Sequence, residues 1–304
     1  MFEINLLANG GMMPFPNRLL TSMCLRYNGY SVLIDCGEGT QIALRNKGLT
    51  AKSIDLMLIT HFHGDHTIGI PGMLLLAANQ DKTTPLTIVG PKGITDIVNG
   101  LLVVAPHLPF EIHCIELNEK QESFTFNDLE INAFKVKHST ECYGYSISLA
   151  RAGKFDVEKA LALNLEKKYW KVLQSGEKVI IDDKEYTPDM VLGPKRKGLK
   201  VTYVTDSRPT KSIEENAIDS DLFICEGMYG DNSMIDSAKD KKHMTFIEAA
   251  TLAKNANVKE LWLTHYSPSL TNPEEYLPET RKIFANTQAF LDGGKVDLNF
   301  NYNR

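Results

Sequence analysis

The chain has 304 residues, of which 43% are hydrophobic and 23% are charged, and its formal net charge is −5. This charge argues against a protein that is basic overall and coats nucleic acid with its whole surface. The length suits two compact domains or one large α/β domain with a sizeable core. Because no run of about 18 uncharged apolar residues is present, we expect no membrane span.

Two further features concern the compartment in which the protein works. The segment from Met1 to Asn5 lacks the basic region and the cleavage signature of a secretory signal. The five cysteines are odd in number and never form a C-x-x-C pair, which argues against a disulfide framework and a structural zinc ribbon. We therefore expect reduced thiols and a cytoplasmic protein.

The N-terminal part of the chain predicts short strands separated by Gly and Pro turns. Strands are predicted at residues 3–7, 30–35 and 54–59, and a helix is predicted from Thr40 towards Asn46. Residues 70–77 predict the opening of a buried helix that tolerates a proline in its first turn. Further strands are predicted at 86–89, 131–136, 199–204, 222–225 and 261–264, and helices at 93–103, 210–217 and 245–256. This mixture indicates an α/β or α+β fold with layered sheets.

Residues 153–194 interrupt this pattern. The segment is helical and Lys-rich, carries Tyr169 and Trp170, and ends in a polar hairpin around Asp182, so an insertion is predicted. From Arg151 to Lys200 there are twelve Lys and Arg against eight Asp and Glu, a local charge of +4 in an otherwise acidic chain. A basic insertion can meet a polyanion at one place, although an ordinary solvated helix face explains the charge equally well.

Three histidines and a carboxylate lie within residues 60–66 (THFHGDH), directly after a predicted strand. Such a cluster is hard to explain structurally, because each core imidazole needs a partner for both of its nitrogens. In an extended loop His61 and His63 point to the same side. Gly64 then lets the chain turn, so that Asp65 and His66 face a second centre. The loop therefore predicts two ligands for each of two neighbouring metal ions.

Three more metal-capable residues each follow a predicted strand, where α/β folds place their sites. The two predicted ligand sets are His61, His63, His138 and Asp206 for one ion, and Asp65, His66, His265 and Asp206 for the other. Imidazole and carboxylate donors without thiolate favour zinc, with manganese and iron as alternatives. Two such ions can lower the pKa of a bridging water and stabilise the charge on an attacked phosphorus or carbonyl.

Three residues are candidates for proton transfer. The carboxylate of Asp65 can orient the nucleophile and accept its proton. His243, which precedes a predicted helix and has no place among the ligands, is a candidate general acid for the leaving group. Glu226 follows the strand at 222–225 and can orient His243. For His243 and Glu226, a residue without a catalytic role is the alternative.

The cluster at 60–66 resembles the signature of the metallo-β-lactamase superfamily, an αββα sandwich with a dinuclear site along one edge. Further motifs are similar to those of the ribonuclease Z family of tRNA 3′-processing endonucleases: 35–41 (DCGEGTQ), 69–72 (GIPG), 90–93 (GPKG), 205–209 (TDSRP) and 263–265 (LTH). The resemblance runs from about Ile4 to Ser267. It implies one domain over residues 1–304, with 153–194 as a protruding, substrate-binding arm.

The resemblance also implies a function. The protein would be a zinc-dependent endoribonuclease that removes 3′ trailers from precursor tRNA, leaving a 3′-hydroxyl on the tRNA and a 5′-phosphate on the trailer. Two zinc ions per subunit would be bound by His61, His63, Asp65, His66, His138, Asp206 and His265. Asp65 would also accept a proton, and His243 with Glu226 would assist departure of the leaving group. Family members are usually homodimers, in which the arm of one subunit grips tRNA bound to the other.

Two segments depart from the family pattern. The arm reads LEKKYWK at 165–171, where better-known bacterial members carry a Gly-Pro-rich tip, and the usual His-Glu-Ala-Thr segment is CEGM at 225–228. Two other functions stay open. One is a hydrolase of a small phosphodiester, thioester or lactone, which would have little use for the arm. The other is a nucleic-acid-binding protein with structural metals, which the absence of thiolates from the cluster disfavours.

Overall fold

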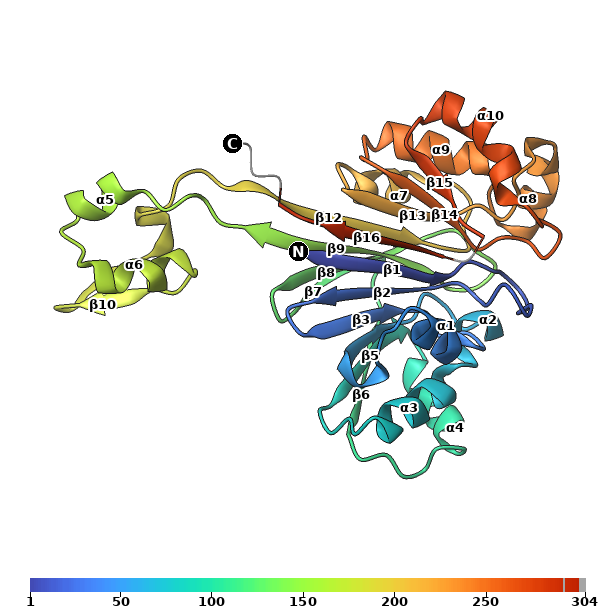
Figure 1. The fold of residues 1–304 in the computed structure, drawn as a ribbon, viewed down its shortest axis with the longest axis horizontal. Helices are drawn as coiled ribbons and strands as arrows, with labels where there is room; N and C mark the ends of the chain where they lie inside the picture. The colour runs from blue at the N-terminus through green and yellow to red at the C-terminus, as the bar shows by residue number, and fades with distance from the viewer. Residues whose placement is uncertain (292, 301–304) are drawn as a thin grey trace.

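Two stacked β-sheets form the centre of the protein, which a computed structural model describes over residues 1–291 and 293–300 (Figure 1). In spatial order, the first sheet consists of β16 (Gly294–Leu298), β1 (Phe2–Ala8), β2 (Ser22–Tyr27), β3 (Tyr30–Ile34), β4 (Ile54–Leu58), β5 (Leu86–Pro91) and β6 (Ile112–Leu117). The second consists of β15 (Thr287–Ala289), β14 (Leu261–Thr264), β13 (Leu222–Glu226), β12 (Arg196–Val204), β9 (Tyr143–Arg151), β8 (Leu129–Lys135) and β7 (Gln121–Phe126).

Helices cover the outer face of each sheet (Figure 1). The helices are α1 (Thr40–Asn46), α2 (Gly64–Thr67), α3 (Ile70–Asn79), α4 (Ile94–Leu102), α5 (Val157–Ala162), α6 (Lys167–Gln174), α7 (Lys211–Ala217), α8 (Ile235–Lys241), α9 (Phe246–Asn255) and α10 (Leu277–Ile283). Side chains of α1, α3 and α4 pack on the first sheet, and those of α7, α9 and α10 pack on the second. The expected αββα sandwich is therefore confirmed.

The layers explain why the central strands are apolar throughout. Every residue of β3 is buried, because both faces of its sheet are covered. Val32 and Ile34 point into the core between the two sheets, whereas Leu33 points towards the helices. This alternation follows from the two-residue period of a strand. The described part of the chain contains no helix long and apolar enough to cross a membrane.

Both sheets direct the ends of parallel strands to one edge of the sandwich. Strands β3 to β6 are parallel in the first sheet, as are β12 to β15 in the second. The loop after β4 meets the start of β9, where the amide of Tyr143 donates to the carbonyl of Thr60 at 3.0 Å. Loops at strand ends are therefore brought together from segments far apart in the sequence.

Residues 153–194, termed the arm below, form a lobe that stands away from the sandwich (Figure 1). The lobe contains α5, α6 and the hairpin of β10 (Val179–Ile181) and β11 (Lys184–Tyr186). It has its own apolar cluster, in which Ala160, Leu165, Leu173 and Val191 are buried. The neck is formed by the ends of β9 and β12, which pair antiparallel.

The charge of this region is unevenly distributed. Within the arm itself, seven Lys stand against eight Asp and Glu, so the lobe has a net charge of −1. The positive excess comes from five residues outside it, namely Arg151, Lys195, Arg196, Lys197 and Lys200. All five lie in or beside the strands of the neck. The basic patch expected from the sequence is therefore at the base of the arm rather than on the lobe.

The separate apolar cluster predicts that the lobe unfolds independently. Replacing fully buried Leu173 with Ala should lower the free energy of unfolding of the lobe by about 2–5 kcal/mol. Because the apolar cluster of the lobe contains four buried side chains, we expect this loss to unfold the lobe. We expect proteolysis of the arm and altered Trp170 fluorescence, with unchanged thermal unfolding of the sandwich. Exposed Lys171 on the same helix provides the control variant Lys171→Ala. A single unfolding transition that shifts as a whole would contradict this expectation.

Candidate metal centre

The residues predicted to bind metal meet where the strands end. The THFHGDH loop follows β4, while His138, Asp206 and His265 follow β8, β12 and β14. Asp206 and His265 have positive φ angles of 25° and 56°, as does Asp35 after β3, at 60°. Such backbone conformations are unfavourable for side-chain-bearing residues and persist where the surroundings hold them, often at functional sites. The fold therefore constrains these side chains before any ligand binds.

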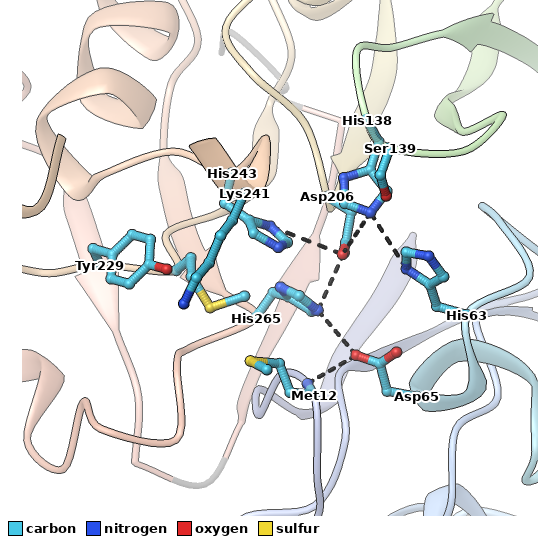
Figure 2. A pocket seen from close by; sticks show the side chains of 11 residues that line it. Met12, His63, Asp65, His138, Ser139, Asp206, Tyr229, Lys241, His243 and His265 are labelled. Atoms are coloured by element: carbon cyan, nitrogen blue, oxygen red, sulfur yellow. Dashed lines mark hydrogen bonds and ion pairs between the residues drawn. The ribbon is translucent and has the colours of Figure 1, made fainter. Parts of the chain in front are cut away.

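The first donor cluster contains His61, His63, His138 and Asp206, with one donor atom from each within 4.8 Å of the others. Nδ1 of His63 lies 3.0 Å from Nε2 of His61 and 3.3 Å from Nε2 of His138. His61 is fully buried and His63 is exposed at the mouth of a pocket (Figure 2). The structure thus brings together the four residues of the first predicted ligand set.

The second donor cluster contains Asp65, His66 and His265. Oδ2 of Asp65 lies 3.5 Å from Nε2 of His66 and 3.4 Å from Nε2 of His265. Asp206 lies between the two clusters. Its Oδ1 is 3.3 Å from His66 and 3.1 Å from His265, whereas its Oδ2 is 3.7 Å from Nε2 of His61. One carboxylate therefore presents one oxygen to each cluster.

Unpartnered polar atoms indicate that the donors fit a cation. Nε2 of His66, Oδ1 of Asp206 and Nδ1 of His265 are buried and make no hydrogen bond of acceptable geometry with a described residue, although Oδ1 of Asp206 lies close to the rings of His66 and His265. Leaving a buried polar group unpaired costs about 1–3 kcal/mol, and more for a charged group. A divalent cation bound by both Nε2 of His66 and Oδ1 of Asp206 would satisfy both atoms. Imidazole and carboxylate donors are those that zinc and similar divalent metals prefer.

The protonation states of His61, His138 and Asp206 suit metal binding. Burial, reinforced by the charge of His66, lowers the pKa of His61 well below its usual value. Burial likewise lowers the pKa of His138 to about 4, so its imidazole is neutral at neutral pH. The pKa of Asp206 is held far below its usual range: burial opposes this, but the charges of His265 and His66 outweigh it. Neutral imidazoles and ionised carboxylates are the forms that coordinate metal. At His66 the effect of burial is outweighed by the charges of Asp35 and Asp206, which raise its pKa well above the usual value, so a bound cation would displace its proton.

Asp35 supports the second cluster from behind. Its buried carboxylate accepts hydrogen bonds from Nδ1 of His66 at 2.9 Å and from the amide of Thr60 at 2.9 Å. The bond to Nδ1 fixes the ring of His66 with Nε2 facing the donor cluster. Asp35 lies in the motif at 35–41, but the motif alone does not indicate a role for it. Its position at a strand end, shared with the other site residues, was the available signal.

His243 and Glu226 form a hydrogen-bonded pair beside the donor clusters. Nδ1 of His243 donates to Oε2 of buried Glu226 at 3.1 Å, and its ring stacks on that of His265 with centroids 5.6 Å apart. Burial opposes protonation of His243, but the charge of Glu226 and this hydrogen bond raise its pKa to about 9. The pair forms although residues 225–228 lack the histidine usual in the resembled family.

Arg208 connects the loops that carry Asp206 and His243. Its guanidinium pairs with Glu248, at 3.0 Å from Oε2, and donates to the backbone carbonyl of His243. Glu248 in turn accepts from the amide of Thr245 in the capping box of α9. This network fixes the separation of the two loops. No local pattern predicts this network, because Arg208 and Glu248 are 40 residues apart in the chain.

A pocket of about 320 Å³ opens over both donor clusters. Figure 2 shows Asp65 and His63 on one side of it and His243 and Lys241 on the other, with Asp206 and His265 between them. The volume lies within the roughly 300–1,000 Å³ of small-molecule sites. A phosphodiester entering it would face carboxylates on one flank and a protonated imidazole on another.

The chain is similar to known proteins of two families. The family described as Anti-Pycsar protein Apyc1 matches residues 15–191. The protein named Ribonuclease Z from Lachnospira eligens is 57% identical over 300 residues, covering 99% of both chains. Its namesake from Agathobacter rectalis is 55% identical with the same coverage. The crystal structure of human tRNase Z, short form, has a TM-score of 0.71 at 24% identity, covering 98% of this chain and 100% of that chain, and supports the fold.

The bond between Asp35 and His66 predicts a metal-binding defect. Because it orients His66, Asp35→Asn should weaken binding of a divalent metal about 10- to 100-fold. Competition with a fluorescent chelator measures this affinity. Asp96→Asn, on the exposed first turn of α4, is the matched control and should bind metal like the unmodified protein. Unchanged affinity in Asp35→Asn would remove Asp35 from the support of the site.

Proposed function

We propose that this chain, which belongs to the ribonuclease Z family, is a metal-dependent endoribonuclease that removes 3′ trailers from precursor tRNA. Its residues 15–191 also match the family described as Anti-Pycsar protein Apyc1. Relatives that share more than half of its residues over nearly full length support this assignment. The observation that carries it in the structure is the pair of donor clusters sharing Asp206 at the floor of an open pocket.

We propose that the site binds two zinc ions per subunit, with manganese and iron as alternatives. The first ion would be held by His61, His63, His138 and Asp206, and the second by Asp65, His66, His265 and Asp206. When bound, divalent cations lower the pKa of a water molecule and offset the charge on the attacked phosphate. The predominance of imidazoles in the donor set supports zinc, and the lack of thiolates is typical of a catalytic rather than a structural zinc site.

Asp65 is the proposed proton acceptor. Its Oδ2 accepts a hydrogen bond from the amide of Met12 at 2.8 Å, which helps to hold the carboxylate at the pocket wall. The hydrogen bonds and charges of His265 and His66 outweigh burial and lower the pKa of Asp65, so it is ionised. As water oxygen attacks the phosphorus, its proton passes to this carboxylate. General-base help of this kind requires hydrogen-bond reach of the attacking water, which the pocket permits.

His243 is the proposed proton donor, and Glu226 is the residue that positions it. The bond that breaks joins the phosphorus to the 3′-oxygen of the tRNA, which leaves as an alkoxide unless it is protonated. His243 is protonated at neutral pH and lies across the pocket from Asp65 (Figure 2). Proton donation there yields a tRNA 3′-hydroxyl and a 5′-phosphate on the trailer.

The position of the arm supports a homodimer. Strands β9 and β12 have nine residues each and span about 30 Å, with the donor clusters at one end and the arm at the other. We propose that the arm grips tRNA bound to the partner subunit and that Arg196 and Lys197 in the neck contact phosphates. We also propose a cytoplasmic location, which the five free cysteines support, four of them buried.

A small phosphodiester is the alternative substrate. The pocket alone would accept one, whereas an arm about 30 Å from the donor clusters has no use in such a reaction.

We predict that the protein with zinc or manganese cleaves a tRNA transcript bearing a 3′ trailer, and that a chelator abolishes cleavage. Added salt should weaken binding, because phosphate contacts release counterions. Turnover of a chromogenic diester without any transcript cleavage would favour the alternative.

Leaving-group dependence tests the role of His243. Because protonation matters only for a poor leaving group, His243→Ala should slow transcript cleavage about 10²–10⁴-fold. Hydrolysis of bis(p-nitrophenyl) phosphate should suffer much less. Asp65→Ala should slow both reactions by several orders of magnitude, since both need the activated water. Exposed Lys239→Ala on α8 is the control. Equal losses with both substrates in His243→Ala would contradict its role as proton donor.

A further inference from the structure

A second cavity lies in the arm, far from the metal centre. It has a volume of about 420 Å³ and is lined by residues of the α5–α6 connection, of α6 and of the β10–β11 hairpin. Figure 1 shows the α5–α6 connection and the hairpin at the outer part of the arm. Nothing in the chemistry proposed for the metal centre uses this cavity.

Two tyrosines give the cavity its character. Tyr169 and Tyr186 both line it and are half-buried, so their rings are partly accessible. A lysine ammonium lies over each ring: Lys168 is 4.8 Å from the centroid of Tyr169, and Lys184 is 5.0 Å from that of Tyr186. These separations are within the range of cation–π attraction. Accessible aromatic rings are the groups on which single-stranded nucleic acids stack their bases.

The edge of the cavity is polar but not basic. Asn164, Glu166 and Asp182 line it together with Lys184. Two carboxylates repel a phosphate, yet they accept hydrogen bonds from the N–H groups of a nucleobase, and the amide of Asn164 can both donate and accept. The net charge of −1 on the arm also disfavours binding of a phosphate. The cavity therefore suits a flat, uncharged heterocycle better than an anion.

We propose that this cavity binds an unpaired nucleobase of the tRNA substrate, which stacks on Tyr169 and presents its edge to Asn164. The inference rests on the proposed function and assigns a specific contact to the arm. Folded RNA offers such bases in its loops, and proteins recognise them by stacking and by hydrogen bonds to base edges. In this arrangement, the neck binds phosphates by charge and the lobe binds one base by stacking.

Tyr169 allows a clean test, because it does not belong to the apolar cluster of the lobe. Tyr169→Ala should weaken binding of a precursor tRNA transcript on the order of tenfold, and Tyr169→Phe, which keeps the ring, should restore most of the affinity. The slope of log Kd against log salt should stay unchanged, since stacking releases no counterions. Exposed Ile180→Ala on β10 is the matched control. Trp170 fluorescence reports whether the lobe stays folded.

Asn164→Gly provides a second variant that the fold tolerates, because Asn164 has a φ of 53°, which glycine adopts readily. It should weaken transcript binding severalfold. A substrate limited to the acceptor stem and trailer lacks the RNA loops that offer unpaired bases. Its KM should therefore be the same for both variants as for the unmodified protein. Wild-type affinity in Tyr169→Ala, or a loss accompanied by a reduced salt slope, would overturn the base-binding site. Failure of the unmodified protein to cleave any precursor tRNA would instead overturn the proposed function.

Discussion

The shared carboxylate of Asp206 is the constraint on which the candidate site depends. It is 2% exposed, and each of its oxygens faces a different donor cluster. A buried carboxylate without a compensating charge is strongly unfavourable. The surrounding imidazoles offset part of this cost, and bound cations would offset the rest. The histidine loop after β4 and the strand ends of β8 and β14 all converge on this one side chain.

The sandwich keeps this arrangement rigid through contacts outside the donor clusters. Asp35 orients His66 from the end of β3, and Arg208 joins the loop of Asp206 to that of His243. Glu226 holds His243 by its ring and also accepts from the amide of Ser207. Most of these contacts join segments that follow different strands, so the sheets set the geometry and the side chains maintain it. The arm, by contrast, extends from the far end of β9 and β12 and has its own core.

Much of this organisation could be predicted from the sequence, for local reasons. Three histidines within six residues, and His265 directly after an apolar strand, are signals confined to short windows. The helix predicted at 245–256 is confirmed as α9, whose Thr245 and Glu248 form the capping box that such spacing indicates. The contact of Arg208 with Glu248 could not be predicted, because it depends on how α9 packs. The same holds for β16, which pairs with β1 from the other end of the chain. The local charge of +4 around the arm is evident from the sequence, but its location in the neck follows only from the strand boundaries.

Anomalous diffraction from crystals grown with zinc tests the central claim most directly. Data collected on both sides of the zinc absorption edge should show two peaks, one beside His61, His63 and His138 and the other beside Asp65, His66 and His265, with Asp206 touching both. A saturated crystal with no peak in the histidine loop, and with those imidazoles hydrogen-bonded to ordinary protein groups, would contradict the account.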